Sequence, residues 1–242
     1  YMNFKIILHE SAEAKKINWH LSSKYSVMCL MPLRYSAIQK ENLEMDSNVI
    51  IRKGAEIHSF LLTLNNAYST KHKFKTINIH YSDDSQYKNT RVLDNFLEGF
   101  SLSNYQFNKH KTSANNTPFK LKTTFNNKIV GDSVKGACIA RDLVNEPLSH
   151  LNAEQLSSTL KYLSKESGFR LEVLNEKKIK ELKMGGVLSV NQGSIAKPTF
   201  NILTYQSKKS QSKHPVVLVG KGVMYDTGGL SLKPTQNSMD MM

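Results

Sequence analysis

The chain has 242 residues, of which 39% are hydrophobic and 22% are charged, a size and composition that normally give one or two domains. No run approaches roughly 18 apolar residues and no charged and apolar leader opens the sequence, so we expect no membrane span, no secretion and a cytoplasmic location. Cys29 and Cys138 are too few and too far apart in the sequence to indicate a disulfide framework or a cysteine zinc site.

The formal net charge of +13 indicates a basic surface, which attracts nucleic acid and anionic membranes. The charges are scattered, however, and the densest lysine runs, residues 71–75 and 208–213, are short. The first run leads into a predicted strand and the second is a polar loop, so both are typical of solvated faces. DNA binding stays open as an alternative function of a different class.

The first part of the chain predicts an α/β unit. Apolar strands are expected over residues 4–8, 26–31 and 76–81. Helical patterns alternate with these strands, one over residues 92–102 and one marked by apolar side chains at spacings of three and four, namely Ile57, Phe60, Leu61 and Leu64.

Residues 108–127 are polar, rich in Lys, Thr and Asn, and contain Pro118, which favours a linker. We therefore expect two domains. The first covers residues 1–125, including the linker, and the second covers residues 126–242.

The second unit begins with a predicted helix over residues 133–145, which Pro147 ends. Four polar residues at its end could form a catalytic cluster: Arg141, Asp142, Asn145 and Glu146. We favour a structural interpretation, in which Arg141 and Glu146 tie the linker to the second domain. Asn152 and Gln155 form a capping pair for the next helix, which Gly168 ends.

Strands and a short helix follow. A strand is predicted over residues 169–173, a short helix contains Ile179 and Leu182, and another strand covers residues 200–205. This β-α-β order is typical of a mostly parallel sheet.

The most informative segment runs from residue 215 to residue 234. Residues 215–219, which contain the apolar run 216–219, predict a central strand of a parallel sheet, and such strands place functional groups at their carboxyl ends. Three charged residues leave this strand on a glycine-rich loop: Lys221, Asp226 and Lys233. An ordinary tight turn with an Asx turn at Asp226 is the alternative. A phosphate loop is disfavoured because no G-x-x-x-x-G-K-[ST] string is present.

Four motifs in order resemble the leucine aminopeptidases, the cytosol aminopeptidase family of two-metal exopeptidases. The motifs are F-L-E-G-F-S-L-S-N-Y-Q-F at residues 96–107, A-R-D-L-V-N-E-P at 140–147, M-G-G-V-L-S-V-N-Q-G-S at 184–194 and V-G-K-G-V-M-Y-D-T-G-G-L-S-L-K-P at 219–234. The resemblance implies an amino-terminal α/β domain followed by the first part of a catalytic α/β domain built on a mostly parallel sheet.

The resemblance also implies roles for the three charged residues. Lys221 matches a lysine metal ligand, Asp226 matches the aspartate that bridges two metals, and Lys233 matches the catalytic lysine. Chemistry agrees with these roles, because a lysine amine coordinates a metal only when neutral, and a charged lysine stabilises an oxyanion. The implied cofactors are two divalent ions, zinc or manganese, and the implied partners are peptide substrates and five further copies in a homo-hexamer.

One departure from the family concerns its later metal ligands. The family's M-D-x-M segment matches residues 239–242 and is followed by a further aspartate ligand and, much later, by an N-T-D-A-E-G-R motif, and neither is present in this sequence. One carboxylate and one amine do not hold two divalent ions tightly. We therefore expect this sequence to be the amino-terminal half of an aminopeptidase and to be inactive by itself. A noncatalytic remnant that binds partners is the other alternative.

Other catalytic chemistries find no support in the sequence. The eight histidines are dispersed and form no H-E-x-x-H or H-x-x-E-H pattern. No G-x-S-x-G nucleophile elbow is present.

Overall fold

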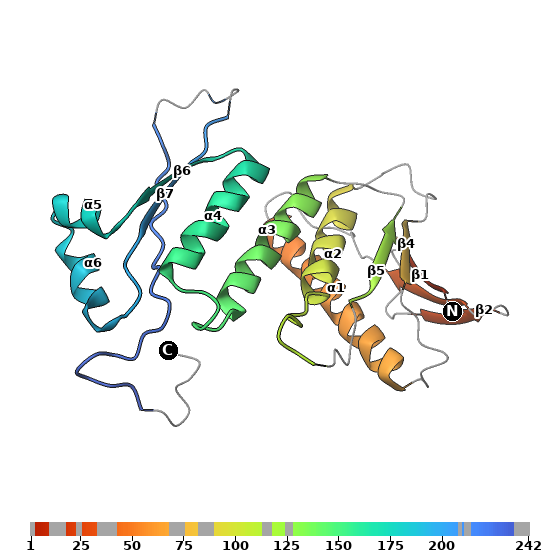
Figure 1. Cartoon of the computed structure of the whole chain (residues 1–242). Coiled ribbons are helices and arrows are strands. Elements are labelled where there is room, and N and C mark those ends of the chain that lie inside the picture. The colour runs from red at the N-terminus through yellow and green to blue at the C-terminus, as the bar shows by residue number, and fades with distance from the viewer. Residues whose placement is uncertain are drawn as a thin grey trace. The chain divides into compact units, whose positions relative to one another are not determined.

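The computed structural model describes residues 3–9, 18–22, 26–32, 43–67, 76–81, 90–112, 118–123, 128–207, 210 and 214–234 (Figure 1). The chain divides into two compact units, residues 1–144 and residues 145–242. The domain boundary near residue 125 that composition predicts stays a prediction. The lysines of the 71–75 and 208–213 runs lie outside the described residues.

The first unit contains a five-stranded sheet in the order β2-β3-β1-β4-β5. Strand β1 pairs in parallel with β3 and β4, strand β4 pairs in parallel with β5, and β2 runs antiparallel to β3. The α/β class is therefore confirmed. The strands are β1 (Asn3–His9), β2 (Asn18–Ser22), β3 (Ser26–Pro32), β4 (Thr76–Tyr81) and β5 (Lys120–Thr123).

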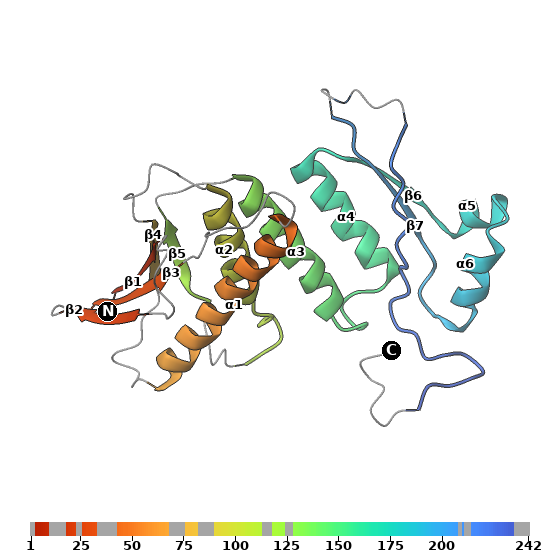
Figure 2. The ribbon, with the colours of Figure 1, turned by 180° about the vertical axis from the view of Figure 1, so that it is seen from behind.

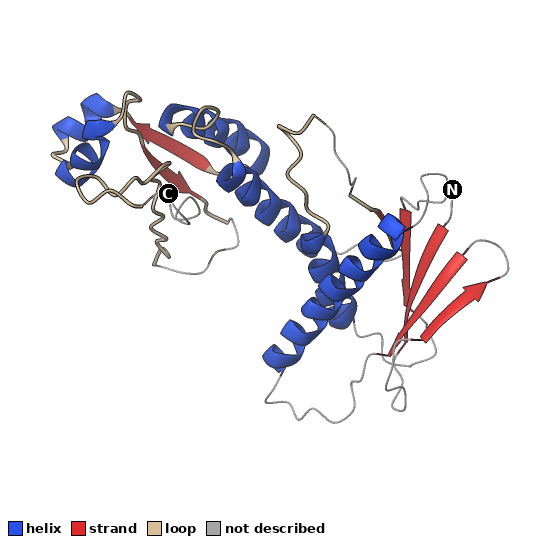
Figure 3. Ribbon diagram, turned by 90° about the horizontal axis from the view of Figure 1, so that it is seen from below, coloured by secondary structure: helices blue, strands red, loops and turns tan. Residues whose placement is uncertain are grey.

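Helices α1 (Leu43–Ala67) and α2 (Thr90–Ser103) lie on the same face of this sheet (Figure 3). They pack very closely at two glycines, because a Cβ atom at Gly99 would lie 1.9 Å from the Ile51 carbonyl oxygen and one at Gly54 would lie 2.3 Å from the Phe96 carbonyl oxygen. The core of the unit combines apolar side chains of both helices and of β4: Ile57, Leu61, Ile77, Ile79, Leu93, Phe96 and Phe100.

One apolar residue of the α1 pattern, Phe60, differs from Ile57 and Leu61 in its burial. Phe60 is 39% exposed, and the side chain of Leu64 lies outside those that the structure describes. The apolar face of α1 is therefore narrower than the spacing of its apolar residues predicts.

Part of the segment predicted as a linker is ordered into the sheet. The Asn104 side chain bonds both backbone groups of Phe119, accepting from its N–H at 2.8 Å and donating to its carbonyl oxygen at 2.8 Å. Phe119 is buried and leads directly into β5. The polar sequence K-L-K-T gives no strand pattern of its own, and its strand conformation follows from pairing with β4.

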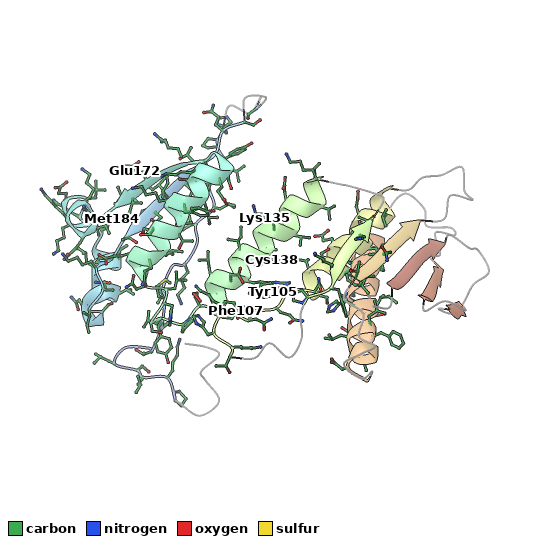
Figure 4. The ribbon with its side chains drawn as sticks, turned by 45° about the vertical axis from the view of Figure 1, so that its right-hand side comes forward. Tyr105, Phe107, Lys135, Cys138, Glu172 and Met184 are labelled. Carbon is green, nitrogen blue, oxygen red and sulfur yellow. The ribbon has the colours of Figure 1, made fainter. Side chains whose placement is uncertain are left out.

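Helix α3 (Lys128–Asn145) begins earlier than predicted and has no buried residue. Arg141 donates from Nη1 to the Leu102 carbonyl oxygen at 2.5 Å, and its guanidinium lies 5.4 Å from the centroid of the Tyr105 ring. The Tyr105 hydroxyl donates to Oδ1 of Asp142 at 2.8 Å. Tyr105 is labelled beside α3 in Figure 4. These contacts join α3 to the segment after α2, which supports the structural interpretation of Arg141.

In the second unit, α4 (Ala153–Ser167) begins and ends where its capping residues predict. Asn152 Oδ1 accepts from the Gln155 N–H at 3.0 Å, and the Asn152 N–H donates to Gln155 Oε1 at 2.8 Å. Gly168 follows with a φ of +73°, and its N–H donates to the Ser164 carbonyl oxygen.

Helix α4 lies beside the strand pair β6 (Arg170–Leu174) and β7 (Phe200–Thr204), as Figures 1 and 2 both show. Ser157 of α4 is buried, and its hydroxyl oxygen lies within hydrogen-bond distance of Thr199 Oγ1, at 2.9 Å, and of Asn201 Oδ1, at 2.8 Å. The pair is antiparallel, whereas the β-α-β order predicted parallel pairing. Between the strands lie α5 (Glu176–Glu181), α6 (Gly185–Val190) and a 3₁₀ turn, η3 (Asn191–Gly193).

The central strand predicted over residues 215–219 is wrong for this structure. These residues form no strand, and Val216 and Val219 are 89% and 92% exposed. An extended segment becomes a strand only when a neighbour completes its hydrogen bonds, and none of the described strands pairs with residues 215–219.

The helices in the described part of the chain include none that is long and apolar enough to cross a membrane.

Candidate metal centre

All three predicted site residues meet at one carboxylate. Oδ2 of Asp226 lies 3.2 Å from Nζ of Lys221 and 3.2 Å from Nζ of Lys233. The Asp226 and Lys233 side chains are 37% and 27% exposed, whereas that of Lys221 is 72% exposed. The site is therefore an open loop in which two ammonium groups approach the same oxygen atom.

A turn after Asp226 produces this arrangement. The Lys233 N–H donates to the Thr227 carbonyl oxygen at 2.9 Å, which closes the loop. Gly228 has a φ of +90°, and a Cβ atom there would lie 2.3 Å from the Ser231 carbonyl oxygen. Both observations require glycine at this position, because other residues rarely adopt such a backbone and none has room for its Cβ.

The other oxygen of the Asp226 carboxylate is held by the backbone. The Gly228 N–H donates to Oδ1 at 3.1 Å, two residues along the chain, which is the geometry of an Asx turn. The turn that the sequence offered as an alternative is thus present, and it orients the carboxylate toward the lysines. Sequence reasoning did not assign the Gly228 amide to the site, although the spacing of Asp226 and Gly228 is the signal of such a turn.

The pKa of Asp226 is lowered, first by the hydrogen bond from the Gly228 N–H and then by those from Lys221 and Lys233. Each of these groups favours the charged carboxylate over the neutral acid. Asp226 therefore remains an anion to lower pH than an ordinary aspartate.

An ionised carboxylate and a lysine amine are donor types that divalent metals accept, so Asp226 and Lys221 fit part of a metal centre. Among the described residues, no group of three or more His, Cys, Asp and Glu side chains could hold a metal ion. The described donors therefore fill one part of the coordination that a divalent ion requires. The motif predicted at residues 239–242 lies outside the described residues.

Comparison with known proteins shows which family this loop is similar to. Residues 138–242 match the catalytic domain of the cytosol aminopeptidase family. The matched stretch contains Lys221, Asp226 and Lys233. The resemblance to this family is therefore confirmed.

Curated relatives extend the similarity beyond the catalytic domain. The probable cytosol aminopeptidase of Chlorobaculum parvum is 48% identical over 110 residues, which are 45% of this chain and 22% of the relative. That of Chlorobium phaeobacteroides is 34% identical over 179 residues, or 66% of this chain and 35% of the relative. That of Chloroherpeton thalassium is 38% identical over 174 residues, or 62% of this chain and 34% of the relative. The chain thus spans about a third or less of these relatives' length.

Solved structures show the same fold. The bottromycin maturation enzyme BotP in complex with Mn superposes with a TM-score of 0.68 at 20% identity, covering 96% of this chain and 50% of that chain. A second BotP structure gives a TM-score of 0.69 at 20% identity, covering 97% of this chain and 52% of that chain. At this identity the likeness concerns the fold alone.

Proposed function

We propose that the protein carrying this sequence is a metalloaminopeptidase that releases amino-terminal residues, leucine and similar ones, from peptides. The observation that carries the proposal is the meeting of Lys221 and Lys233 at the carboxylate of Asp226, inside the stretch that matches the cytosol aminopeptidase catalytic domain. The similarity to probable cytosol aminopeptidases and to the manganese complex of BotP supports the same proposal.

Each of the three residues has a chemical task in this proposal. Asp226, kept ionised by its neighbours, would supply an anionic donor to the divalent ions, and Lys221 would supply its amine. Lys233 stays charged and stabilises the oxyanion that forms at the scissile carbonyl. When bound, the ions, zinc or manganese, supply Lewis acidity and a more acidic water.

The 242 residues alone are proposed to be inactive, because the sequence holds one carboxylate and one amine of the metal set that the family resemblance implies. The family resemblance further favours a homo-hexamer and a cytoplasmic location for the whole protein. Its first unit, residues 1–144, contributes none of the three proposed site residues.

The class of enzyme is tested with leucine p-nitroanilide and its N-acetylated form, using the protein as cells produce it. We expect hydrolysis of the free-amine substrate alone, stimulated by Mn²⁺ or Zn²⁺ and abolished by a chelator. Lys233→Met should lower kcat by about 10²- to 10³-fold, the usual cost of removing one oxyanion-stabilising group. Equal hydrolysis of both substrates, or activity that survives chelation, would contradict a metalloaminopeptidase.

A further inference from the structure

The two oxygens of the Asp226 carboxylate have different surroundings. Oδ1 accepts the Gly228 N–H, whereas Oδ2 lies 3.2 Å from both lysine ammonium groups. Since Oδ1 is held by the backbone, Oδ2 is the oxygen that faces other cations. A divalent ion that approaches Oδ2 meets two positive charges already in contact with it.

The two lysines differ in how firmly the fold keeps them there. Lys221 is 72% exposed and lies five positions before Asp226 in the sequence. Lys233 is 27% exposed, and its own N–H closes the turn on the Thr227 carbonyl oxygen. The turn therefore holds Lys233 beside the carboxylate, and Lys233 is the more persistent competitor of an arriving ion.

We propose that the Lys233 ammonium competes with a divalent cation for Oδ2 of Asp226, so that binding of the cation moves Lys233 off the carboxylate. The inference rests on the proposed function in one respect, since it takes Asp226 as a metal ligand. In this proposal Lys233 lowers the affinity of Asp226 for the metal ion. The positive charge of Lys233 becomes available to stabilise an oxyanion only once the ion has displaced Lys233 from the carboxylate.

Removing the Lys233 side chain leaves the turn intact. The closing hydrogen bond uses the backbone N–H of Lys233, and the Asp226 carboxylate is oriented by the Gly228 N–H. An amide NMR spectrum of Lys233→Met with an unchanged Gly228 resonance verifies this point before affinity is measured.

The test is the affinity of the protein as cells produce it for Mn²⁺, read from the electron paramagnetic resonance signal of the free ion. Lys233→Met should bind Mn²⁺ about two- to fivefold more tightly than the wild type, the range expected when one exposed ion pair no longer competes. Lys233→Arg keeps the charge and should bind like the wild type. Lys180→Met removes a lysine paired with Glu176 on α5 and serves as the control for net charge.

The outcomes separate the inference from the proposed function. An affinity in Lys233→Met that equals or falls below that of the wild type overturns the inference, as does an equal gain in Lys180→Met. The proposed function keeps its metal ligand in either case if Asp226→Asn abolishes Mn²⁺ binding. Mn²⁺ binding that is absent from the wild type, or unaffected by Asp226→Asn, overturns both.

Discussion

Asp226 receives three donors from a short stretch of chain: the Gly228 N–H and the ammonium groups of Lys221 and Lys233. These donors keep the carboxylate ionised although it is partly exposed. The backbone donor lowers the pKa of Asp226 most, and it is fixed by the turn rather than dependent on flexible lysine side chains. The residue that sets the electrostatics of the site is therefore Gly228 as much as either lysine.

Gly228→Ala should raise the pKa of Asp226 toward its ordinary value. The added Cβ would lie 2.3 Å from the Ser231 carbonyl oxygen at a φ of +90°, so the turn must open and the hydrogen bond to Oδ1 is lost. The pKa is measured from the carboxyl ¹³C shift of Asp226 during a pH titration. Gly222→Ala is the control, because a Cβ there meets no atom within 4 Å. An unchanged pKa in Gly228→Ala would contradict the assigned role of this amide.

His58 links pH to the stability of the first unit. Its side chain is 4% exposed. The imidazole ring contacts the aromatic rings of Phe100 and Phe119, at centroid distances of 5.3 and 5.6 Å. Burial lowers the pKa of His58, an effect partly offset by Asn104. Nε2 finds no hydrogen-bond partner among the described residues.

The unfolded chain therefore binds a proton at His58 at higher pH than the folded chain does. Stability of the first unit should be constant above the unfolded pKa of about 6.5 and fall as pH drops from there through the lowered folded pKa. Urea unfolding at a series of pH values measures this slope. In His58→Leu the slope should shrink, with stability at pH 8 unchanged or about 1 kcal/mol higher, since the buried Nε2 is removed. An equal slope in the variant would assign the pH dependence to other groups.

The helices differ in whether the residues that determine their ends and contacts lie close together or far apart in the sequence. Helix α4 is specified by Asn152, Gln155 and Gly168, whose side chains or backbone act on neighbours in the sequence, and its ends were predictable. Contact between α1 and α2 depends instead on glycines far apart in the chain, Gly54 and Gly99. The periodic pattern predicts each of these helices but does not predict how closely they approach.

Gly99→Ala should destabilise the first unit by roughly 1–3 kcal/mol, the usual cost of overpacking a close contact. The new Cβ would lie 1.9 Å from the backbone oxygen of Ile51, so α1 and α2 must separate. The matched control is Gly136→Ala in α3, where a Cβ meets nothing within 4 Å and helix propensity improves. Denaturant unfolding compares the two variants. Similar stability of Gly99→Ala and the wild type would contradict the close packing.

Strands were predictable where they are apolar and missed where pairing creates them. The predicted ranges near β1, β3 and β4 are confirmed, while β2 and β5 carry little apolar pattern and form by pairing with β3 and β4. Residues 215–219 show the converse, since their pattern predicts a strand and no described strand pairs with them. At the site, resemblance supplied Lys221, Asp226 and Lys233, but the Gly228 amide required the three-dimensional turn.

At the scale of the whole molecule, the second unit exposes an apolar run. Val216, Val217, Leu218 and Val219 are 89%, 74%, 90% and 92% exposed. Extended β-branched segments of this kind associate with other chains through backbone hydrogen bonds and apolar contact. The 242-residue chain should therefore self-associate.

Sedimentation at increasing protein concentration measures this association. Leu218→Asp should reduce it strongly, because it places a charge within the run. Ile129→Asp, which replaces an exposed apolar residue of α3 in the first unit, should have little effect. A wild-type chain that stays monomeric at every concentration would contradict the account.

The central claim is that Asp226 is the anionic anchor of a metalloaminopeptidase site. Its most direct test is leucine release from a leucyl peptide with Mn²⁺ by the protein as cells produce it, comparing wild type, Asp226→Asn and the control Glu176→Gln, which removes another lysine-paired carboxylate. The account predicts that Asp226→Asn lowers activity by more than about a hundredfold, because even indirect partners of metal ligands cost 10- to 100-fold, while Glu176→Gln stays near wild type. Full activity of Asp226→Asn would contradict it.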